Sequence, residues 1–303
     1  MPSIRFSIIV TFHNQREFIR EALESALSQR RAGFEVIAID DASTDGTPEI
    51  LQNYDGKIKV KCLETNEGAC SARNRGAALA TGEYLVFLDG DDAFLPWALD
   101  VYERIVQAKK PALLLAGMSW FKGPLPALQP ADAPREITLV EYPDYFRRDR
   151  GFGHSASAMV IVRQAFEDVH GWLEGFFPAE DNEMAMRLGT CGRVIQILSP
   201  LTILHRAHAG NSINSISSFI PAMKNLMKRE RQGHYPGGAR RRFERRALLG
   251  GMVLHWARRA AKNGLYGDAM DLMLRSSPML LAAAARRLGV IIGGRQRTEM
   301  IKL

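Results

Sequence analysis

The sequence predicts an α/β protein built on a mainly parallel sheet covered by helices, followed by a helical C-terminal region. Three observations predict this class. Apolar strand-like runs alternate with segments of helical period up to about residue 117. The runs are continuous rather than alternating, which is typical of strands buried on both faces of a parallel sheet. From residue 217 on, the pattern is helical and is broken mainly by glycine and proline.

The first half of the chain supplies strands and helices in turn. Residues 6–12 form the first apolar run, and Asn14 is placed to cap a helix whose apolar residues recur at helical period through Leu27. The further strands expected here are FEVIAID (34–40), KIKVKCL (57–63), EYLVFLD (83–89) and ALLLAG (112–117). The helices expected between them begin in PEILQNY (48–54), ACSARNRGAALA (69–80) and LPWALDVYERIVQAKK (95–110).

The second half of the chain is less regular. Residues 123–153 are rich in proline and loosely patterned, which predicts a surface excursion. The elements expected after it are the strand SASAMVIV (155–162), the helix AEDNEMAMRLGTCG (179–192) and the short strands VIQIL (194–198) and LTILH (201–205). We place the end of the first domain at residue 216 and expect residues 217–303 to form a separate, mainly helical region.

Composition excludes several classes of protein. With 46% hydrophobic and 24% charged residues, the chain of 303 residues has the composition of an ordinary globular protein. Its three cysteines are widely spaced and form no C-x-x-C pair, so the sequence indicates neither a disulfide framework nor a zinc site and fits a reducing cytoplasm. Arg5 precedes a short apolar run without a cleavage site, so we expect no signal peptide. No apolar stretch reaches the roughly 20 residues that span a bilayer.

Charge is divided unevenly along the chain. Residues 221–303 hold 18 Lys and Arg against 5 Asp and Glu, whereas residues 1–220 hold 22 against 28. The basic segment has three interpretations: a solvated helical surface packed on the first domain, attachment to an anionic membrane surface, or nucleic-acid binding. Residues 240–262 mix Arg clusters with Leu248, Leu249, Val253 and Trp256, as helices that lie on membranes do. No nucleic-acid motif accompanies the charge, so nucleic acid is the least favoured partner.

Carboxylates follow two of the expected strands. In an open parallel sheet, ligands bind at the edge formed by the carboxyl ends of the strands. Asp89 and Asp91 flank Gly90, so in extended geometry their side chains point the same way, and the glycine leaves room for a ligand near the backbone. Such a pair suits a shared Mg2+ or Mn2+ ion with open positions for phosphate oxygens. A plain turn is the alternative, because Asp and Gly are common turn residues.

Asp40 and Asp41 repeat the pattern after the strand at residues 34–40. Here too a turn is the alternative, with Ser43 or Thr44 capping the next helix. Two acidic pairs on one edge, without Lys or Arg beside them in the sequence, call for a cation or a hydrogen-bond donor from elsewhere. We therefore expect a bound cation or an external hydrogen-bond donor at this edge.

Six segments together resemble the family 2 glycosyltransferases, inverting enzymes with the GT-A fold. They are, in the order in which the family has them, SIIVTFHN, AIDDASTDGT, NEGACSARNRG, YLVFLDGDD, FPAEDNEMAMRL and HRAHAGNSI. The shared order makes the match specific. The resemblance implies a Rossmann-like GT-A domain over residues 1–216. It also implies a non-processive enzyme, because the Q-x-x-R-W signature of the processive synthases is absent.

The resemblance implies a donor site as well. Thr11, Phe12 and His13 would line the base pocket, and Asp41 would accept a hydrogen bond from N3–H of uracil with Asp40 supporting it. The chain departs from the family at Thr11 and His13, where proline and tyrosine are common, and both departures bear on base recognition.

The remaining donor and metal residues follow from the same motifs. Arg73 would reach the nucleotide, and Asp89, beside Gly90, would face the ribose or a metal-bound water. Asp91 would coordinate Mn2+ or Mg2+ directly, and His208 would meet the metal or the diphosphate.

Asp181 matches the position of the family's catalytic base, with Glu180 beside it. Without the resemblance, Asp181 is an acidic residue in the first turn of a helix, which the helix dipole favours. Arg206 is expected to reach the diphosphate or the acceptor, or to be a solvated surface residue. Acceptor choice is expected to lie in residues 123–157 and around Trp172.

The resemblance therefore implies a cytoplasmic, metal-dependent enzyme. It would move a sugar from a nucleotide sugar, a UDP-sugar, to a hydroxyl of a saccharide or lipid-linked acceptor, in surface polysaccharide or glycolipid assembly. One alternative is a nucleotidyltransferase, although no glycine-rich loop with lysine follows the first strand. The other is a non-catalytic partner protein with the same fold.

Overall fold

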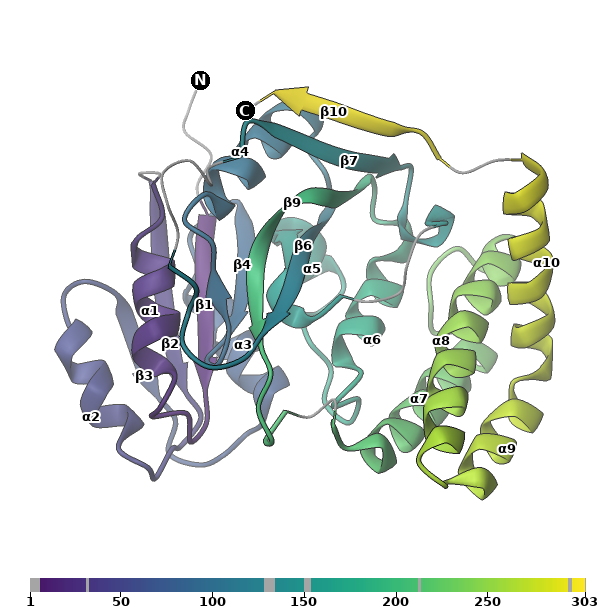
Figure 1. Cartoon of the computed structure of the whole chain (residues 1–303), viewed down its shortest axis with the longest axis horizontal. Coiled ribbons are helices and arrows are strands. Elements are labelled where there is room, and N and C mark those ends of the chain that lie inside the picture. Colours follow the sequence, from purple (N-terminus) through teal and green to yellow (C-terminus); the bar gives the residue numbers. More distant parts are fainter. Residues whose placement is uncertain are drawn as a thin grey trace.

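A ten-stranded sheet lies at the centre of the molecule. The computed structural model describes residues 6–30, 33–127, 134–149, 154–211, 214–293 and 296–302. The strands are β1 (Phe6–Phe12), β2 (Phe34–Asp40), β3 (Lys59–Cys62), β4 (Tyr84–Asp89), β5 (Ala93–Phe94), β6 (Leu113–Phe121), β7 (Glu136–Tyr142), β8 (Met159–Val162), β9 (Val194–Arg206) and β10 (Thr298–Lys302). Their order along the sheet is β10-β7-β9-β6-β8-β4-β1-β2-β3, and β5 pairs with β9 (Figure 1).

The first four strands of the chain, β1 to β4, form a parallel part of the sheet. β3, β2, β1 and β4 all run in one direction, so their carboxyl ends meet at one edge. β8 runs antiparallel to both β4 and β6, and β7 and β10 continue the sheet in antiparallel pairs. The α/β class is confirmed. The sheet is mixed, and its parallel part is the part that carries the predicted carboxylates.

Helices cover both faces of the sheet, and each face has its own apolar cluster. On one face, Phe6, Ile8 and Val10 of β1 pack with three helices, α1 (Ile19–Leu27), α2 (Thr47–Leu51) and α4 (Ala98–Lys109). On the other face, Ile9 packs with α3 (Ala69–Leu79), α5 (Arg163–Asp168) and α6 (Glu180–Arg187). Because successive strand residues point to opposite faces, both sets must be apolar, which explains the continuous run in β1.

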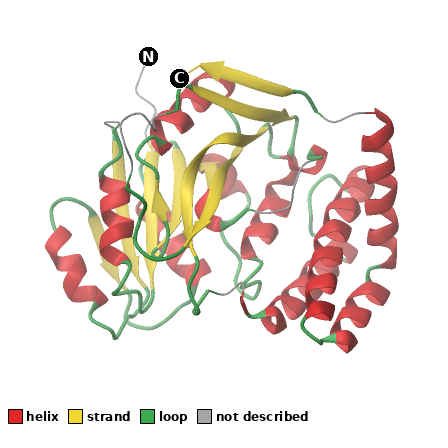
Figure 2. Ribbon diagram, viewed as in Figure 1, coloured by secondary structure: helices red, strands yellow, loops and turns green. Residues whose placement is uncertain are grey.

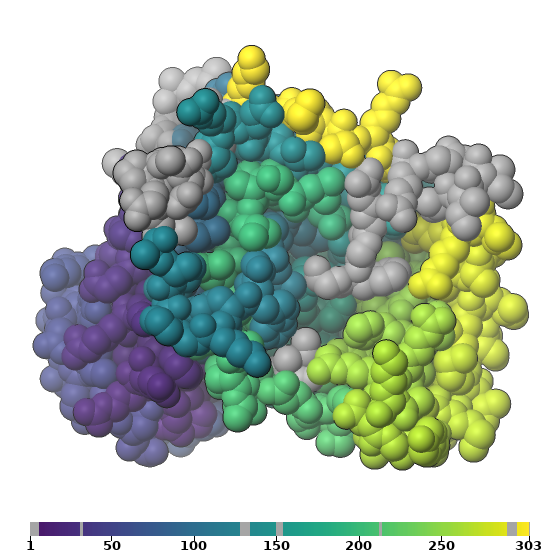
Figure 3. Space-filling view, viewed as in Figure 1, coloured from purple at the N-terminus to yellow at the C-terminus, as the bar shows by residue number. Residues whose placement is uncertain are grey.

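The C-terminal region is helical, as predicted. Its helices are α7 (Ile216–Arg231), α8 (Arg242–Lys262), α9 (Tyr266–Arg275) and α10 (Ser277–Gly293). They lie side by side beyond one end of the sheet (Figures 1 and 2) and form one continuous surface in the space-filling view (Figure 3). Among the helices that the structure describes, none is long and apolar enough to cross a membrane.

The four apolar residues of α8 that were expected on a membrane are not available to it. Leu248, Leu249, Val253 and Trp256 are buried and belong to the same apolar cluster as α6. α8 packs against α7, α9 and α10, so it is the central helix of the region. The prediction that these four residues lie on a lipid surface is therefore wrong.

Three further predictions differ from the structure. Within residues 123–153, EITLVEY forms strand β7, because it pairs with β9 and β10. VIQIL and LTILH belong to the single strand β9, whose register against β6 shifts near Pro200. Asn14 does not cap α1: it has a left-handed backbone with a φ of 52°, and its side chain accepts a hydrogen bond from the Thr44 amide.

β10 was not predicted. It pairs with β7 and so returns the end of the described chain to the sheet. Lys109 of α4 forms ion pairs with Glu299 of β10 and Glu141 of β7, at 2.8 and 3.1 Å. The division of the chain at residue 216 stays a prediction, because the helices and the sheet share both a strand pairing and an apolar cluster.

Candidate active site

Two adjoining cavities lie at the carboxyl edge of the parallel strands. The first has a volume of about 660 Å3 and is lined by residues that follow β1, β2, β4 and β9. The second has a volume of about 450 Å3 and lies between the sheet and helices α6, α7 and α8. Asp89, Glu180 and His205 line both cavities. A molecule in one cavity would thus be next to a molecule in the other.

The first cavity brings together most of the predicted donor and metal residues. Those that line it are Thr11, Phe12, His13, Asp41, Arg73, Asp89, Asp91 and His208. They come from segments up to about 200 positions apart, and the sheet edge gathers them. Asp40 and Gly90 do not line this cavity, and Asp181 lines the second one.

Asp41 anchors the loop that precedes α3. Its two carboxylate oxygens accept hydrogen bonds from the amides of Glu67 and Gly68, at 2.7 and 2.8 Å. Its backbone carbonyl accepts one from Nδ1 of His13 at 2.7 Å, and the Asn66 amide lies 3.0 Å from Nε2 of the same ring. Backbone amides are therefore the donors that stabilise the negative charge of the Asp41 carboxylate. Each carboxylate oxygen retains capacity for a second hydrogen bond.

Asp40 and Gly90 have structural positions. The Asp40 carboxylate is buried and accepts a hydrogen bond from the Ser43 amide at 3.1 Å, which holds the turn behind Asp41. A Cβ atom at residue 90 would lie 2.2 Å from a ring carbon of Phe12. The glycine is thus required by the packing of Phe12. The expectation that it leaves room for a ligand near the backbone is not what the structure shows.

Arg73 neutralises two carboxylates at the wall between the cavities. Its buried guanidinium donates to Asp89 at 2.6 Å and to Glu180 at 3.1 Å, and it lies over the ring of Trp172. Burial alone would raise the pKa of Asp89, but the charge and hydrogen bond of Arg73, together with His205 and Ser157, outweigh burial and lower that pKa. Burial raises the pKa of Glu180 despite the same partner, and its Oε2 atom is buried without a hydrogen bond.

Asp91 is placed differently from the other carboxylates. Its Oδ2 atom lies 2.8 Å from Nε2 of His208 and 3.5 Å from the Asn211 amide, and neither Lys nor Arg pairs with it in the described part of the chain. The side chains of Asp89 and Asp91 meet different protein partners, and a cation shared between them stays a prediction.

The donor set at Asp91 and His208 fits a divalent ion. One carboxylate and one imidazole suit Mg2+ or Mn2+, which commonly take few protein ligands and complete their shell with water and phosphate oxygens. Within the described ranges, no group of three or more His, Cys, Asp and Glu side chains is arranged to hold a metal. A metal here would therefore depend on oxygen ligands from a bound diphosphate.

His205 and Arg206, at the end of β9, fix the Asp91 turn. Nδ1 of His205 lies 2.7 Å from the buried Asp92 carboxylate, which also accepts from Ser157 at 2.7 Å. Burial would lower the pKa of His205. The hydrogen bond and the negative charge of Asp92 help to raise this pKa to about 8 despite the burial. Arg206 is buried, donates to the Asp91 carbonyl at 3.0 Å and pairs with Glu21. Neither predicted role of Arg206, diphosphate contact or solvated surface residue, is therefore met.

Asp181 opens the first turn of α6 and faces the second cavity. Its side chain is half-buried, and its Oδ1 atom accepts from the backbone and side-chain amides of Asn182, both at 2.6 Å. Burial, followed by the negative charge of Glu180, raises the pKa of Asp181 to about 8. A carboxylate with a raised pKa at a cavity wall is suited to accept a proton near neutral pH.

Aromatic and basic side chains line the rest of the second cavity. Trp120 at the end of β6 is 44% exposed and meets the ring of His205 edge to face. Trp256 and Arg259 of α8 form the opposite wall, with the guanidinium over the indole ring. Trp172, around which acceptor choice was expected, is instead buried against Phe87. His154 to Ala156 do line the cavity, within the other segment expected to choose the acceptor.

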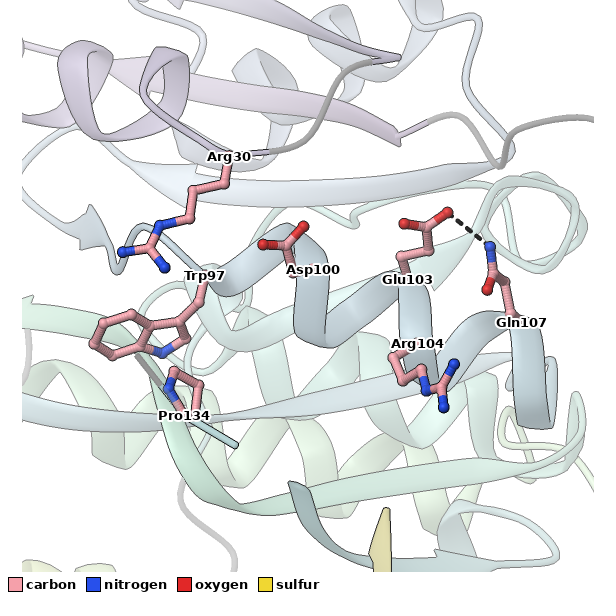
Figure 4. A pocket seen from close by; sticks show the side chains of 7 residues that line it. All are labelled: Arg30, Trp97, Asp100, Glu103, Arg104, Gln107 and Pro134. Atoms are coloured by element: carbon pink, nitrogen blue, oxygen red, sulfur yellow. Dashed lines mark hydrogen bonds between the residues drawn. The ribbon is translucent and has the colours of Figure 1, made fainter. Parts of the chain in front are cut away.

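A further cavity of about 350 Å3 lies beside α4 (Figure 4). Asp100, Glu103 and Arg104 line it, and Glu103 accepts a hydrogen bond from Gln107 at 2.7 Å. None of the predicted site residues lies there, and we assign it no function.

Comparisons with known proteins agree on one family. The profile described as Glycosyl transferase family 2 matches residues 7–169, more than half of the chain. A Bacillus subtilis protein assigned to teichuronic acid biosynthesis as glycosyltransferase TuaG is 43% identical over 101 residues, which cover 32% of this chain and 39% of TuaG. The amylovoran biosynthesis glycosyltransferase AmsB of Erwinia amylovora is 27% identical over 247 residues, covering 76% of this chain and 81% of AmsB.

A solved structure has the same fold. The crystal structure of Staphylococcus aureus TarS residues 1–349 in complex with UDP-GlcNAc superposes with a TM-score of 0.70 and 20% sequence identity. The match covers 92% of this chain and 81% of that one. At this identity the likeness concerns the fold, and it includes the helices that follow the sheet.

Proposed function

This chain belongs to glycosyl transferase family 2, and we propose that it is an inverting glycosyltransferase that moves a sugar from a UDP-sugar to a hydroxyl group of a saccharide or lipid-linked acceptor. The observation that carries the proposal is the pair of adjoining cavities. One holds the predicted nucleotide and metal residues, the other holds Asp181, and Asp89, Glu180 and His205 line both. The first cavity would take the donor and the second the acceptor.

Donor binding is assigned to the end of β1 and the loop after β2. Thr11, Phe12 and His13 would contact the base, and the free hydrogen-bonding capacity of Asp41 would accept N3–H of uracil. Asp40 supports Asp41 through the turn behind it. The complex of TarS with UDP-GlcNAc, a protein of the same fold, supports uracil as the base.

Asp91 and His208 would hold the divalent ion, Mn2+ or Mg2+. When bound, such an ion supplies Lewis-acid stabilisation of the charge that develops on the departing diphosphate. Arg73 has a different task from the one first assigned to it, because its guanidinium is held by Asp89 and Glu180. It keeps both carboxylates in place at the wall where donor and acceptor meet.

Sugar transfer passes through an oxocarbenium-like transition state, and the acceptor hydroxyl must lose a proton as it attacks. Asp181 would take that proton from within the second cavity, a contribution of about 100- to 10,000-fold for a general base. The buried Oε2 atom of Glu180, which lacks a partner, would accept a hydrogen bond from a sugar hydroxyl. Attack on the face opposite the diphosphate converts an α-linked donor into a β-linked product.

The proposed place of action is the cytoplasm, in the assembly of a surface polysaccharide or glycolipid. The names of TuaG and AmsB, which refer to teichuronic acid and amylovoran biosynthesis, support this class of pathway. Trp120 supports a saccharide acceptor, because an exposed indole offers an apolar face to a sugar ring.

The test is release of nucleoside diphosphate from UDP-, GDP- and dTDP-sugars with Mn2+, Mg2+ or EDTA. We expect slow hydrolysis of one UDP-sugar, which EDTA abolishes. Asp91→Ala and Asp181→Asn should reduce it by at least about 100-fold. Asp168→Asn is the matched control, because Asp168 is exposed and lines neither cavity.

Two outcomes would contradict the proposal. Release of pyrophosphate from a nucleoside triphosphate would identify a nucleotidyltransferase. Binding of UDP in calorimetry without turnover of any donor, with or without candidate saccharides, would identify a non-catalytic protein of the same fold.

A further inference from the structure

Helix α9 carries an apolar face that the rest of the described chain leaves exposed. Tyr266, Met270, Met273 and Leu274 are 71, 63, 38 and 71% exposed, and their spacing places them on one side of the helix. The opposite side is apolar as well, since Ala269 and Leu272 are buried in the main cluster. A helix facing only water would have a polar outer face. A contiguous patch of large apolar side chains marks an interaction surface.

Exposed cations precede α9 in the sequence and end it. Arg258 and Lys262 are exposed at the end of α8, directly before α9, and Arg275 ends α9. The acidic Asp271 is neutralised by Lys224 and Arg275, at 2.7 and 2.5 Å. An apolar helix face bordered by Lys and Arg is complementary to a bilayer surface, which offers acyl chains and anionic headgroups together. Tyrosine, with an apolar ring and a polar tip, suits the same boundary.

Helix α9 follows a helix that lines the second cavity. The C-terminal half of α8 lines that cavity with Met252, Trp256 and Arg259, and a short loop after Lys262 leads to Tyr266, the first residue of α9. In Figure 1, α9 lies beside α8, the helix whose other side chains line the second cavity.

We propose that α9 lies on an anionic lipid bilayer through Tyr266, Met270, Met273 and Leu274, and that the acceptor is a lipid-linked saccharide presented at that surface. The acceptor part rests on the proposed function, whereas the membrane contact does not. α9 has ten residues, too few for the roughly 20 that cross a bilayer, so it lies along the surface. This assignment replaces the one made for Leu248, Leu249, Val253 and Trp256 of α8, which are buried.

The test is co-sedimentation of the full chain with vesicles of phosphatidylcholine alone or with one quarter phosphatidylglycerol. We expect binding to the anionic vesicles that weakens at 0.5 M salt. Met270→Ser/Leu274→Ser should lower the partition coefficient at least about tenfold, since it removes half of the apolar contact. Arg258→Ala/Lys262→Ala should weaken binding to anionic vesicles only. The control is Val60→Ser/Leu79→Ser, which changes two exposed apolar residues of β3 and α3, each 37% exposed.

Donor hydrolysis by the same variants separates the two proposals. We expect it to be unchanged in Met270→Ser/Leu274→Ser, because α9 lines neither cavity. Vesicle binding without any donor hydrolysis would leave the membrane contact standing and refute the acceptor claim. Equal vesicle binding by wild type and the α9 variant, or no binding by either, would overturn the contact. A dimer in solution that the α9 variant converts to monomer would assign the face to a second copy of the chain.

Discussion

At the scale of single residues, the carboxylates of the sheet edge differ in what neutralises them. Asp41 accepts two backbone amides, Asp89 pairs with Arg73, and Asp92 pairs with His205. Asp91 has only a histidine and an amide beside it. Partners within the protein lower the free energy of burying the first three, although burial still raises the pKa of Asp92 to about 6. Asp91 is the one of the four whose surroundings leave room for an external cation.

The raised pKa of Asp181 predicts how the reaction depends on pH. A general base works only as the carboxylate, and burial beside Glu180 raises its pKa to about 8. Donor hydrolysis should therefore rise about tenfold per pH unit below pH 8 and level off above it. Rates measured from pH 6 to 9.5 check this. In Asp181→Asn the slope should vanish along with most of the rate, and a wild-type profile that is flat from pH 6 to 8 would contradict the assignment.

The sequence identifies most of the site residues but not their partners. Asp41, Asp89, Asp91 and His208 could be predicted because strand ends and motif order are local properties of the chain. The pairing of Arg73 with Glu180 joins residues 107 positions apart, and that of Asp92 with His205 joins residues 113 apart. No local pattern encodes such pairs. For this reason the sequence predicted a cation or a hydrogen-bond donor from outside the local segment. In the folded chain, backbone amides, Arg73 and His205 neutralise most of these carboxylates.

At the scale of elements, the predicted helices and strands match the structure where the hydrophobic period and the residues that mark the ends of an element indicate the same bounds. β1, β2, β4 and α3 lie within one or two residues of their predicted positions. β7 was missed because its segment is preceded by prolines, which are a signal of loops. β9 was split in two because Pro200 interrupts it, although the strand continues past the proline through a shift of register. Strand pairing overrides the local signal in both cases, because β7 pairs with β9 and β10, and β9 pairs with β6 and β7.

The crossing of α8 and α10 depends on Gly250. A Cβ atom at residue 250 would lie 2.1 Å from the carbonyl oxygen of Met279 and 3.0 Å from Cβ of Ala283. The carbonyl is backbone, so the helices themselves must move apart. We expect Gly250→Ala to lower the free energy of unfolding by about 1–3 kcal/mol, as overpacking does. Urea denaturation followed by circular dichroism measures it.

The matched control is Gly289→Ala in α10. No atom lies within 4 Å of a Cβ built at residue 289, and alanine is the better helix former, so stability should stay equal or rise by up to about 1 kcal/mol. Gly250→Ala as stable as wild type would mean that α8 and α10 do not pack this closely.

At the scale of the whole molecule, the C-terminal helices form part of the candidate active site and are not a separate appendage to it. α7 and α8 supply one wall of the cavity that holds Asp181, and the sheet and α6 supply the other. The apolar cluster under this cavity extends without a break from Ile9 in β1 to Leu272 in α9. Removing the helices would expose the apolar side of α6 and open the acceptor cavity to water. The sequence indicated the change in charge and in hydrophobic period near residue 217. It did not indicate that the sheet and the C-terminal helices share one apolar core.

The shared core predicts that the chain unfolds as one unit despite the change of character at residue 216. Trp97 packs in the cluster of α1 and α4, whereas Trp256 packs in the cluster shared by the sheet and the C-terminal helices. Two variants that each keep one of these tryptophans, with the other three changed to phenylalanine, report on the two parts separately. We expect the fluorescence transitions of both variants in urea to coincide with circular dichroism of the same protein, since a common core couples the parts. If Trp256 reported a transition at lower urea than circular dichroism of the same variant, residue 216 would be a true domain boundary. The second cavity could then open while the nucleotide edge stays folded.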